Sequence, residues 1–425
     1  MEPIKIDDHW VRKQLTDCFT FRQKLGYELK HIMRQASDIF GPSVFSIPSA
    51  SMAQSIKLIA GLIRRDIEER GILISHRKIL ESRGLGSIAR NLQSIIEHLP
   101  DFQAYIYATD EFFRDHIEHQ IRVAVLGNYL LSQRFDSPTG SKRLVDTLSS
   151  ILGLSEDDTR KAWWIAGLFH DIGMPIEKLA RNFSKVIRED LASAYENLDL
   201  NTPKINDPIP DLNSNKFFFE KLTSDFTPAT KKCIETALGW VVSTKIDHGA
   251  VGALALLRSI PDVQNGEEDK MSTLLDSEYK PYLISARAVM IHSLFQKDNS
   301  VEIRSDHAPL AYLLVCCDEM QEWGREVNIK ERSLLDPYFH RDQLVKHCLL
   351  SVSNNELELS FEYKNQKAKD NCHFAFDYYF ADKEKNIERL NNEDHVFPRL
   401  SIEATDFVFD QKELIRTIKK KISKG

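Results

Sequence analysis

The stretch WWIAGLFHDIG, residues 163–173, decides the fold more than any other part of the sequence. An apolar run leads directly into a histidine and a carboxylate, His170 and Asp171. The run predicts a buried helix, and Gly173 with Pro175 predicts that the helix ends or distorts at the pair. Adjacent residues on an intact helix point about 100° apart. Where the helix ends, both side chains can turn toward one divalent metal ion, which imidazole nitrogen and carboxylate oxygen suit as ligands.

Other segments offer the same ligand types on predicted helices. His119 lies on the amphipathic stretch FRDHIEHQIRVAVLGNYLL, and His248 opens the run of small apolar residues in KIDHGAVGALALL. Asp318 follows an unbroken apolar run in PLAYLLVCCDEM, and His292 lies within VMIHSLF. Burying a carboxylate such as Asp318 is costly unless a cation or strong donors compensate it. A metal ion would provide that compensation.

The ordered set of motifs resembles the HD-domain superfamily of metal-dependent phosphohydrolases. The motif H-x-x-R-V begins at His119, L-F-H-D-I-G contains the His170–Asp171 pair, and the last ligand is Asp318. The resemblance covers roughly residues 110–326. It implies that His119, His170, Asp171 and Asp318 hold one divalent metal ion, which could be Mn, Fe, Mg, Co or Ni.

His248 and His292 lie between the pair and the last aspartate, and this resemblance leaves two roles open for them. In HD phosphodiesterases, extra histidines in this interval hold a second metal. In HD deoxynucleotide triphosphohydrolases, a histidine there acts as acid or base beside a single metal. Both histidines are therefore candidate metal ligands and, with Asp171, candidate catalytic residues.

The sequence departs from both branches after the His-Asp pair. Met174 stands where the triphosphohydrolases often have histidine and the HD-GYP phosphodiesterases usually have lysine. His116 stands three residues before the first ligand, where triphosphohydrolases often have arginine. Candidate phosphate contacts are His116, Arg114, Lys178 and Arg325, because cationic side chains suit phosphate oxygens. The strings R-D-H-x-x-H-Q and D-E-x-Q-E-W-G-R resemble an HD branch linked to bacterial defence systems.

The resemblance implies an enzyme that hydrolyses nucleotide phosphates with metal-activated water. We expect first a deoxynucleoside triphosphate triphosphohydrolase, then a cyclic nucleotide or dinucleotide phosphodiesterase, then an alarmone hydrolase. The alternative to an enzyme is a non-catalytic protein that binds a nucleotide or a metal ion as a sensor. Related triphosphohydrolases often form oligomers with allosteric nucleotide sites, so a homo-oligomer with an allosteric nucleotide is expected by that resemblance.

The remaining patterns predict a mostly α protein, an HD helical bundle with N-terminal helices and a smaller α+β C-terminal region. We expect an N-terminal helical region at 1–105, the HD domain at 106–335 with an insertion at about 196–228, and the α+β region at 336–425. LELSFEYKN and FPRLSIEATDFVFD predict strands, and the tail IRTIKKKISKG predicts a helix end. The residues Trp163, Trp164 and Trp323 are predicted to pack in the core.

Composition excludes several classes of function. The net charge is -7, so nucleic acid is not an expected partner. No apolar run approaches the length of a membrane span, and residues 1–10 lack the plan of a signal peptide. The six cysteines show no C-x-x-C pair, which favours reduced thiols over a zinc site. We therefore expect a cytoplasmic protein with no membrane partner.

Overall fold

The fold is taken from a computed structural model, which is mostly α. It describes residues 3–15, 76–93, 96–97, 116–137, 140–178, 220–223, 231–232, 247–260, 278–299, 301–323, 326–327, 342–343, 345–353, 356–363, 385–387, 389–391, 396–409 and 415–423. Most of the predicted insertion at 196–228 lies outside these residues.

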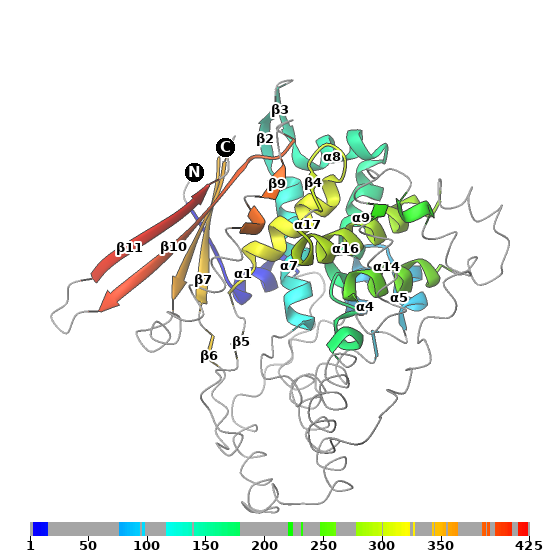
Figure 1. The fold of residues 1–425 in the computed structure, drawn as a ribbon, viewed down its shortest axis with the longest axis horizontal. Helices are drawn as coiled ribbons and strands as arrows, with labels where there is room; N and C mark the ends of the chain where they lie inside the picture. The colour runs from blue at the N-terminus through cyan, green and yellow to red at the C-terminus, as the bar shows by residue number, and fades with distance from the viewer. Residues whose placement is uncertain are drawn as a thin grey trace, which may run out of the picture.

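Helices form the larger part of the described structure (Figure 1). Their bounds are α1 Asp8–Gln14, α4 His76–Ser82, α5 Gly86–Asn91, α7 Ile117–Ser132, α8 Leu144–Leu152, α9 Glu156–Phe169, α14 His248–Arg258, α16 Lys280–Lys297 and α17 Pro309–Met320. Helix α9 packs on α7 and α16, and α16 also packs on α14 and α17. Helix α17 ends at Met320, two residues after Asp318.

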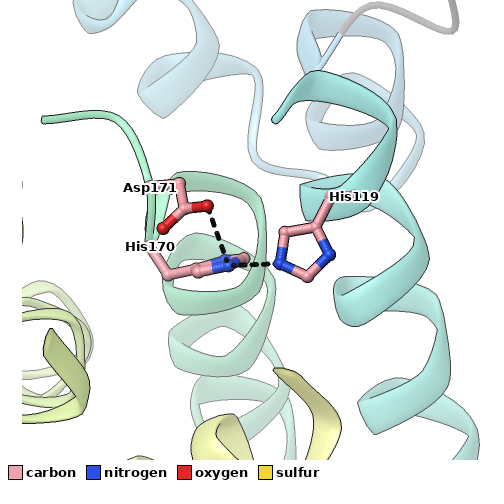
Figure 2. Close-up of side chains that lie close together, drawn as sticks. All are labelled: His119, His170 and Asp171. Carbon is pink, nitrogen blue, oxygen red and sulfur yellow. Dashed lines mark hydrogen bonds and ion pairs between the residues drawn. The ribbon is translucent and has the colours of Figure 1, made fainter. Parts of the chain in front are cut away.

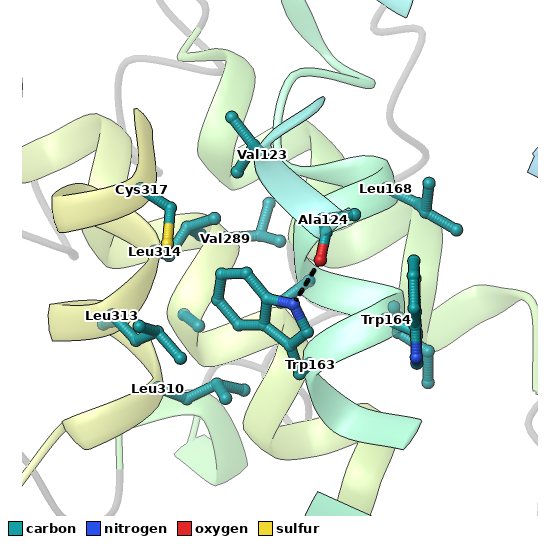
Figure 3. Close-up of a cluster of buried hydrophobic side chains, with 14 of the residues drawn as sticks. Val123, Ala124, Trp163, Trp164, Leu168, Val289, Leu310, Leu313, Leu314 and Cys317 are labelled. Atoms are coloured by element: carbon teal, nitrogen blue, oxygen red, sulfur yellow. Dashed lines mark hydrogen bonds between the residues drawn. The ribbon is translucent and has the colours of Figure 1, made fainter. Parts of the chain in front are cut away.

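Helices α7 and α9 approach closely because small residues face large ones across their contact (Figure 3). A Cβ built at Gly127 would lie 1.8 Å from the Trp163 ring, so only glycine fits there. The fully buried Trp163 donates its indole N–H to the Ala124 carbonyl oxygen at 2.8 Å. Trp164 and Trp323 are buried as well, which confirms the prediction that the three tryptophans pack in the core.

The strands are mostly in the C-terminal part of the chain. A five-stranded sheet has the order β1-β7-β8-β10-β11, in which only the β8–β10 pair is parallel. Its strands are β1 Ile4–Ile6, β7 Val345–Val352, β8 Glu356–Tyr363, β10 Arg399–Phe409 and β11 Ile415–Ser423. Three two-stranded pairs are β2 Arg134–Ser137 with β3 Gly140–Arg143, β4 Ile303–Arg304 with β9 Leu390–Asn391, and β5 Glu326–Val327 with β6 Asp342–Gln343.

Two features of the large sheet correct the sequence-based expectations. The tail predicted as a helix end is strand β11, which pairs antiparallel with β10 from Phe409 opposite Ile415 to Ser401 opposite Ser423. Strand β1 lies within the predicted N-terminal helical region, and it pairs antiparallel with β7, with Ile4 opposite Leu350. Residues from the predicted N-terminal helical region therefore complete a sheet built from the C-terminal region.

One hydrophobic core joins the sheet to the helices. It includes Ile6 of β1, Leu350 of β7 and Trp10 of α1 together with the buried faces of α7, α9 and α17. Helix α1 contacts both β1 and α7, and the Asp8 carboxylate accepts two hydrogen bonds from the buried Arg122 guanidinium of α7. None of the helices described is both long and apolar enough to cross a lipid bilayer.

Candidate metal centre

The end of helix α9 turns His170 and Asp171 toward the same side. Ser155 caps the start of the helix by accepting from the Asp158 N–H, and the helix ends at Phe169. Residues 170–173 form turns, in which the Ile172 N–H donates to the Phe169 carbonyl and the Met174 N–H donates to the Asp171 carbonyl. The predicted helix end at the His-Asp pair is confirmed.

His119, His170 and Asp171 form a first group of converging side chains (Figure 2). The Nε2 atoms of His119 and His170 are 3.2 Å apart, and His170 Nε2 is 3.7 Å from Asp171 Oδ2. One ligand atom from each residue lies within 4.8 Å of the other two. Such a buried set of two imidazoles and a carboxylate is typical of a divalent metal site. We call it the inner group.

Asp318 adjoins the inner group through His119. Its Oδ1 is 2.8 Å from His119 Nε2, while its Oδ2 accepts a hydrogen bond from the Gln296 amide at 2.8 Å. The Asp318 side chain is 13% exposed, although its neighbours along α17 are buried. The structure thus brings all four predicted core ligands to one place, from α7, the end of α9 and α17.

A second group lies on the other side of Asp171. Asp171 Oδ1 is 3.6 Å from His248 Nε2 and 3.9 Å from His292 Nε2, and these ligand atoms lie within 4.8 Å of one another. We call Asp171, His248 and His292 the outer group. Asp171 therefore belongs to both groups, with Oδ2 toward the inner histidines and Oδ1 toward the outer ones.

Four histidines share one orientation: each anchors Nδ1 on an oxygen. The acceptors are the Gly167 carbonyl for His170, the Val289 carbonyl for His292, the Gln321 side-chain oxygen for His119 and the Glu177 carboxylate for His248. A backbone carbonyl can only accept, so Nδ1 of His170 and of His292 donates its proton and leaves Nε2 for a ligand. An imidazole fixed in this way is prepared for metal ligation through Nε2.

The buried Nε2 atom of His248 tests whether this set fits a metal ion. That atom has no hydrogen-bond partner, although a buried polar atom is normally paired. A cation in the outer group would satisfy it, and the donor set of two imidazoles and a carboxylate suits one. The residues present therefore fit a divalent ion in both groups.

The protonation states of the His170–Asp171 pair also suit a cation. Burial lowers the pKa of His170 to about 3, so its imidazole is neutral at physiological pH. Burial would raise the pKa of Asp171, but His170 and the hydrogen bond from His116 outweigh it and hold the pKa well below its usual range. Neutral imidazole and ionised carboxylate are the forms that bind metals.

The four predicted phosphate contacts have different outcomes. His116 lies at the site, where its Nδ1 is 3.0 Å from Asp171 Oδ2 and its buried Nε2 has no partner. Burial lowers the pKa of His116, and the nearby charge of Lys178 lowers it further against the opposing effect of Asp171. Lys178 is half-buried in the helical turn after Asp171. Arg114 and Arg325 lie outside the described residues.

Glu177 and Lys297 form a charged network on the Nδ1 side of His248. The Glu177 carboxylate accepts from the His248 backbone N–H at 2.9 Å and from the Lys297 ammonium at 2.5 Å. Burial would raise the pKa of Glu177, but His248 and Lys297 lower it to about 2. Burial would lower the pKa of Lys297, but Asp247 and Glu177 raise it on balance. Glu177 and Lys297 therefore remain oppositely charged at neutral pH.

Sequence reasoning missed three residues that orient the site: Gln321, Gln296 and Lys297. The side-chain amide of Gln321 donates to the Trp323 carbonyl at 2.7 Å, which turns its oxygen toward His119. Gln321 follows Asp318 by three residues within the string D-E-x-Q-E-W-G-R, which was a usable signal. Gln296 and Lys297 lie at the end of α16 and gave no comparable signal.

Comparisons of the chain with protein families, with curated proteins and with solved structures find no match.

Proposed function

We propose that the protein is a metal-dependent phosphohydrolase of the HD type that acts on nucleotides. The observation that carries this proposal is the position of Asp171, whose carboxylate serves an inner group with His119 and His170 and an outer group with His248 and His292. The order of these residues along α7, α9, α14, α16 and α17 supports membership of the HD superfamily. The helical environment supports it as well.

The metal would be Mn, Fe, Mg, Co or Ni, bound as one or two ions. When bound, such an ion lowers the pKa of a water ligand toward about 7 and offsets charge that develops on phosphate oxygens. His119, His170, Asp171 and Asp318 would hold the ion, and the second carboxylate oxygen of Asp171 would orient the attacking water. If only the inner group is occupied, His248 or His292 would carry a proton on Nε2 and deliver it to the leaving oxygen.

We take a deoxynucleoside triphosphate as the first substrate class, on the strength of the resemblance. His116 and Lys178 would then meet phosphate oxygens beside Asp171. A cyclic nucleotide or dinucleotide is the second candidate, and the outer group favours it, because two metals can stabilise both the attacking and the leaving oxygen. The same proposal includes a cytoplasmic location, assembly into a homo-oligomer and an allosteric nucleotide site. It also includes a role in bacterial defence.

The test measures release of phosphate, pyrophosphate or triphosphate, and the opening of cyclic species to linear phosphomonoesters, in a nucleotide panel with Mn²⁺, Mg²⁺ or Co²⁺. The panel holds the four deoxynucleoside triphosphates, the ribonucleotides, cyclic nucleotides and cyclic dinucleotides, singly and in mixtures that could supply an activator. Triphosphate release that Asp171→Ala abolishes would support the first substrate class. Cleavage of cyclic species alone would support the second. If no member of the panel is hydrolysed while the metal is still bound, the proposal of an enzyme would give way to that of a non-catalytic sensor.

A further inference from the structure

Lys297 is the last residue of α16, and its ammonium group lies behind His248, on the side away from Asp171. Lys297 Nζ is 2.5 Å from Glu177 Oε2, 2.8 Å from Asp247 Oδ2 and 3.4 Å from His248 Nδ1. Glu177, Asp247 and His248 are themselves close enough together to hold a cation. The ammonium group is in contact with all three, so this third group already contains a positive charge that belongs to the chain.

The two carboxylates around Lys297 are fixed by other contacts. Asp247 is 1% exposed, and it caps α14 by accepting from the Ala250 N–H at 2.8 Å and from the Ser293 hydroxyl at 2.8 Å. Glu177 accepts from both the backbone N–H and Nδ1 of His248. Both carboxylates therefore face His248 Nδ1 and Lys297 rather than the outer group on the Nε2 side.

The inner and outer groups consequently differ in charge. Asp318 contacts the inner group, which thus has two carboxylates near two imidazoles. The outer group has only the shared carboxylate of Asp171 among its ligands, and behind His248 the ammonium group of Lys297 neutralises one of the two carboxylate charges of Glu177 and Asp247. A divalent ion is attracted by each carboxylate and repelled by the ammonium group.

We propose that Lys297 is a positioning residue whose ammonium group acts as a built-in cation behind His248 and makes the outer group the weaker of two metal sites. It holds Glu177 and Asp247 so that His248 Nε2 points at Asp171, and its charge lowers the affinity for a second ion. The inference rests on the proposed metal centre but not on any substrate. The inner ion would bind tightly, and the second ion would bind at higher metal concentration.

The experiment titrates the full-length, metal-stripped protein with Mn²⁺, by calorimetry and by the electron paramagnetic resonance signal of free Mn²⁺. Wild type should bind one tight ion and one weaker ion. Lys297→Met should tighten the second ion by about tenfold, because a repelling charge is removed. Lys297→Arg should behave as wild type, because the charge remains. The matched control is Lys280→Met at the other end of α16, where the lysine bonds only the Gly153 carbonyl among the contacts that we describe; it should change neither affinity.

A general loss of structure in Lys297→Met would weaken metal binding, so it cannot produce the tighter binding of the second ion that we expect. Glu177→Gln provides a second test that does not need the Lys297 variants to fold. It removes a negative charge behind His248, so the second ion should bind about tenfold more weakly while the inner ion is retained. A second-ion affinity unchanged in Lys297→Met or in Glu177→Gln would overturn the proposal. Absence of any Mn²⁺ binding would overturn both it and the metal centre, whereas absence of nucleotide hydrolysis would overturn only the proposed function.

Discussion

Gly173 and His248 are in direct backbone contact, which connects the turn after helix α9 to the start of helix α14. A Cβ built at Gly173 would lie 2.1 Å from the His248 carbonyl oxygen, a separation that no real side chain adopts. The contact places the turn that carries Asp171 against His248, whose Nε2 atom belongs to the outer group. The absence of a side chain at position 173 is therefore a requirement of the site and not only of the turn.

Gly173→Ala should separate α14 from the His-Asp turn. We expect a loss of about 1–3 kcal/mol in the free energy of unfolding, as overpacking typically costs. Binding of a second Mn²⁺ ion should weaken more than binding of the first, because His248 moves and His119 does not. Urea unfolding and Mn²⁺ titration would measure both effects. The matched control is Gly86→Ala in α5, where the nearest atoms are 4.0 Å away, so stability should be retained or slightly raised.

Asp171→Asn should remove metal binding without harming the metal-free fold. The substitution keeps the shape and one acceptor oxygen for His116, but it removes the charge shared by the two groups. Mn²⁺ should raise the melting temperature of wild type and leave that of the variant unchanged, because only a ligand that binds the folded state stabilises it. Asp146→Asn, on helix α8, should keep the full response. An Asp171→Asn protein that Mn²⁺ still stabilises would refute the ligand role of Asp171.

Gln321→Leu should lower metal affinity through His119. The variant loses the acceptor for His119 Nδ1, so the ring is free to rotate or to change tautomer. Loss of such a supporting contact typically weakens metal binding 10- to 100-fold, roughly the change expected here for the first Mn²⁺ ion. Gln93→Leu is the control, since the side-chain amide of Gln93 donates an exposed hydrogen bond to Glu97, far along the chain from the site residues. Equal affinity of the two variants would contradict the role of Gln321.

His76 predicts a specific dependence of stability on pH. Burial lowers the pKa of His76 from 6.5 to about 4, although its hydrogen bond to the Gln120 side chain opposes the change. The unfolded chain therefore binds a proton at this position between about pH 6.5 and pH 4, and the folded chain does not. Stability should fall as pH decreases through this window, by at most about 1.4 kcal/mol per pH unit from this residue.

Chemical denaturation in EDTA at several pH values would measure this slope. His76→Gln keeps a polar side chain that can bond Gln120 and cannot titrate, so its stability should fall less steeply between pH 6.5 and pH 5. His170, whose pKa is also lowered by burial, adds a slope of the same sign in both proteins. The same slope in the variant and in wild type would show that His76 does not titrate as expected.

Ile6→Ala tests whether the N-terminal strand belongs to the sheet. Ile6 is fully buried in β1 opposite Cys348 of β7, so the truncation should cost about 2–5 kcal/mol in the free energy of unfolding. Ile4 lies on the same strand and is only half-buried, which makes Ile4→Ala the matched control with a smaller loss. Equal, small losses in urea unfolding would mean that β1 adds little to the sheet.

Sequence patterns were most informative where a local signal agreed with the tertiary contacts. The apolar stretch before His170, the run of small apolar residues that His248 opens and the apolar run before Asp318 correspond to α9, α14 and α17. The tail shows the opposite case. Ile415, Ile418 and Ile422 recur at helical spacing, but pairing with β10 makes the segment a strand. Strand β1 is only three residues long, too short for any period to appear.

The sequence by itself determined which ligand types the chain carries, their order, and the mostly α class of the fold. Only the tertiary structure decided that Asp171 faces two groups, that Gln321 and Glu177 hold Nδ1 of His119 and His248, and that Lys297 lies between two carboxylates. The physical reason is that periodicity and capping act between residues a few positions apart. Hydrogen bonds and ion pairs at the site join residues from different helices. These helices come together only through close packing of the core.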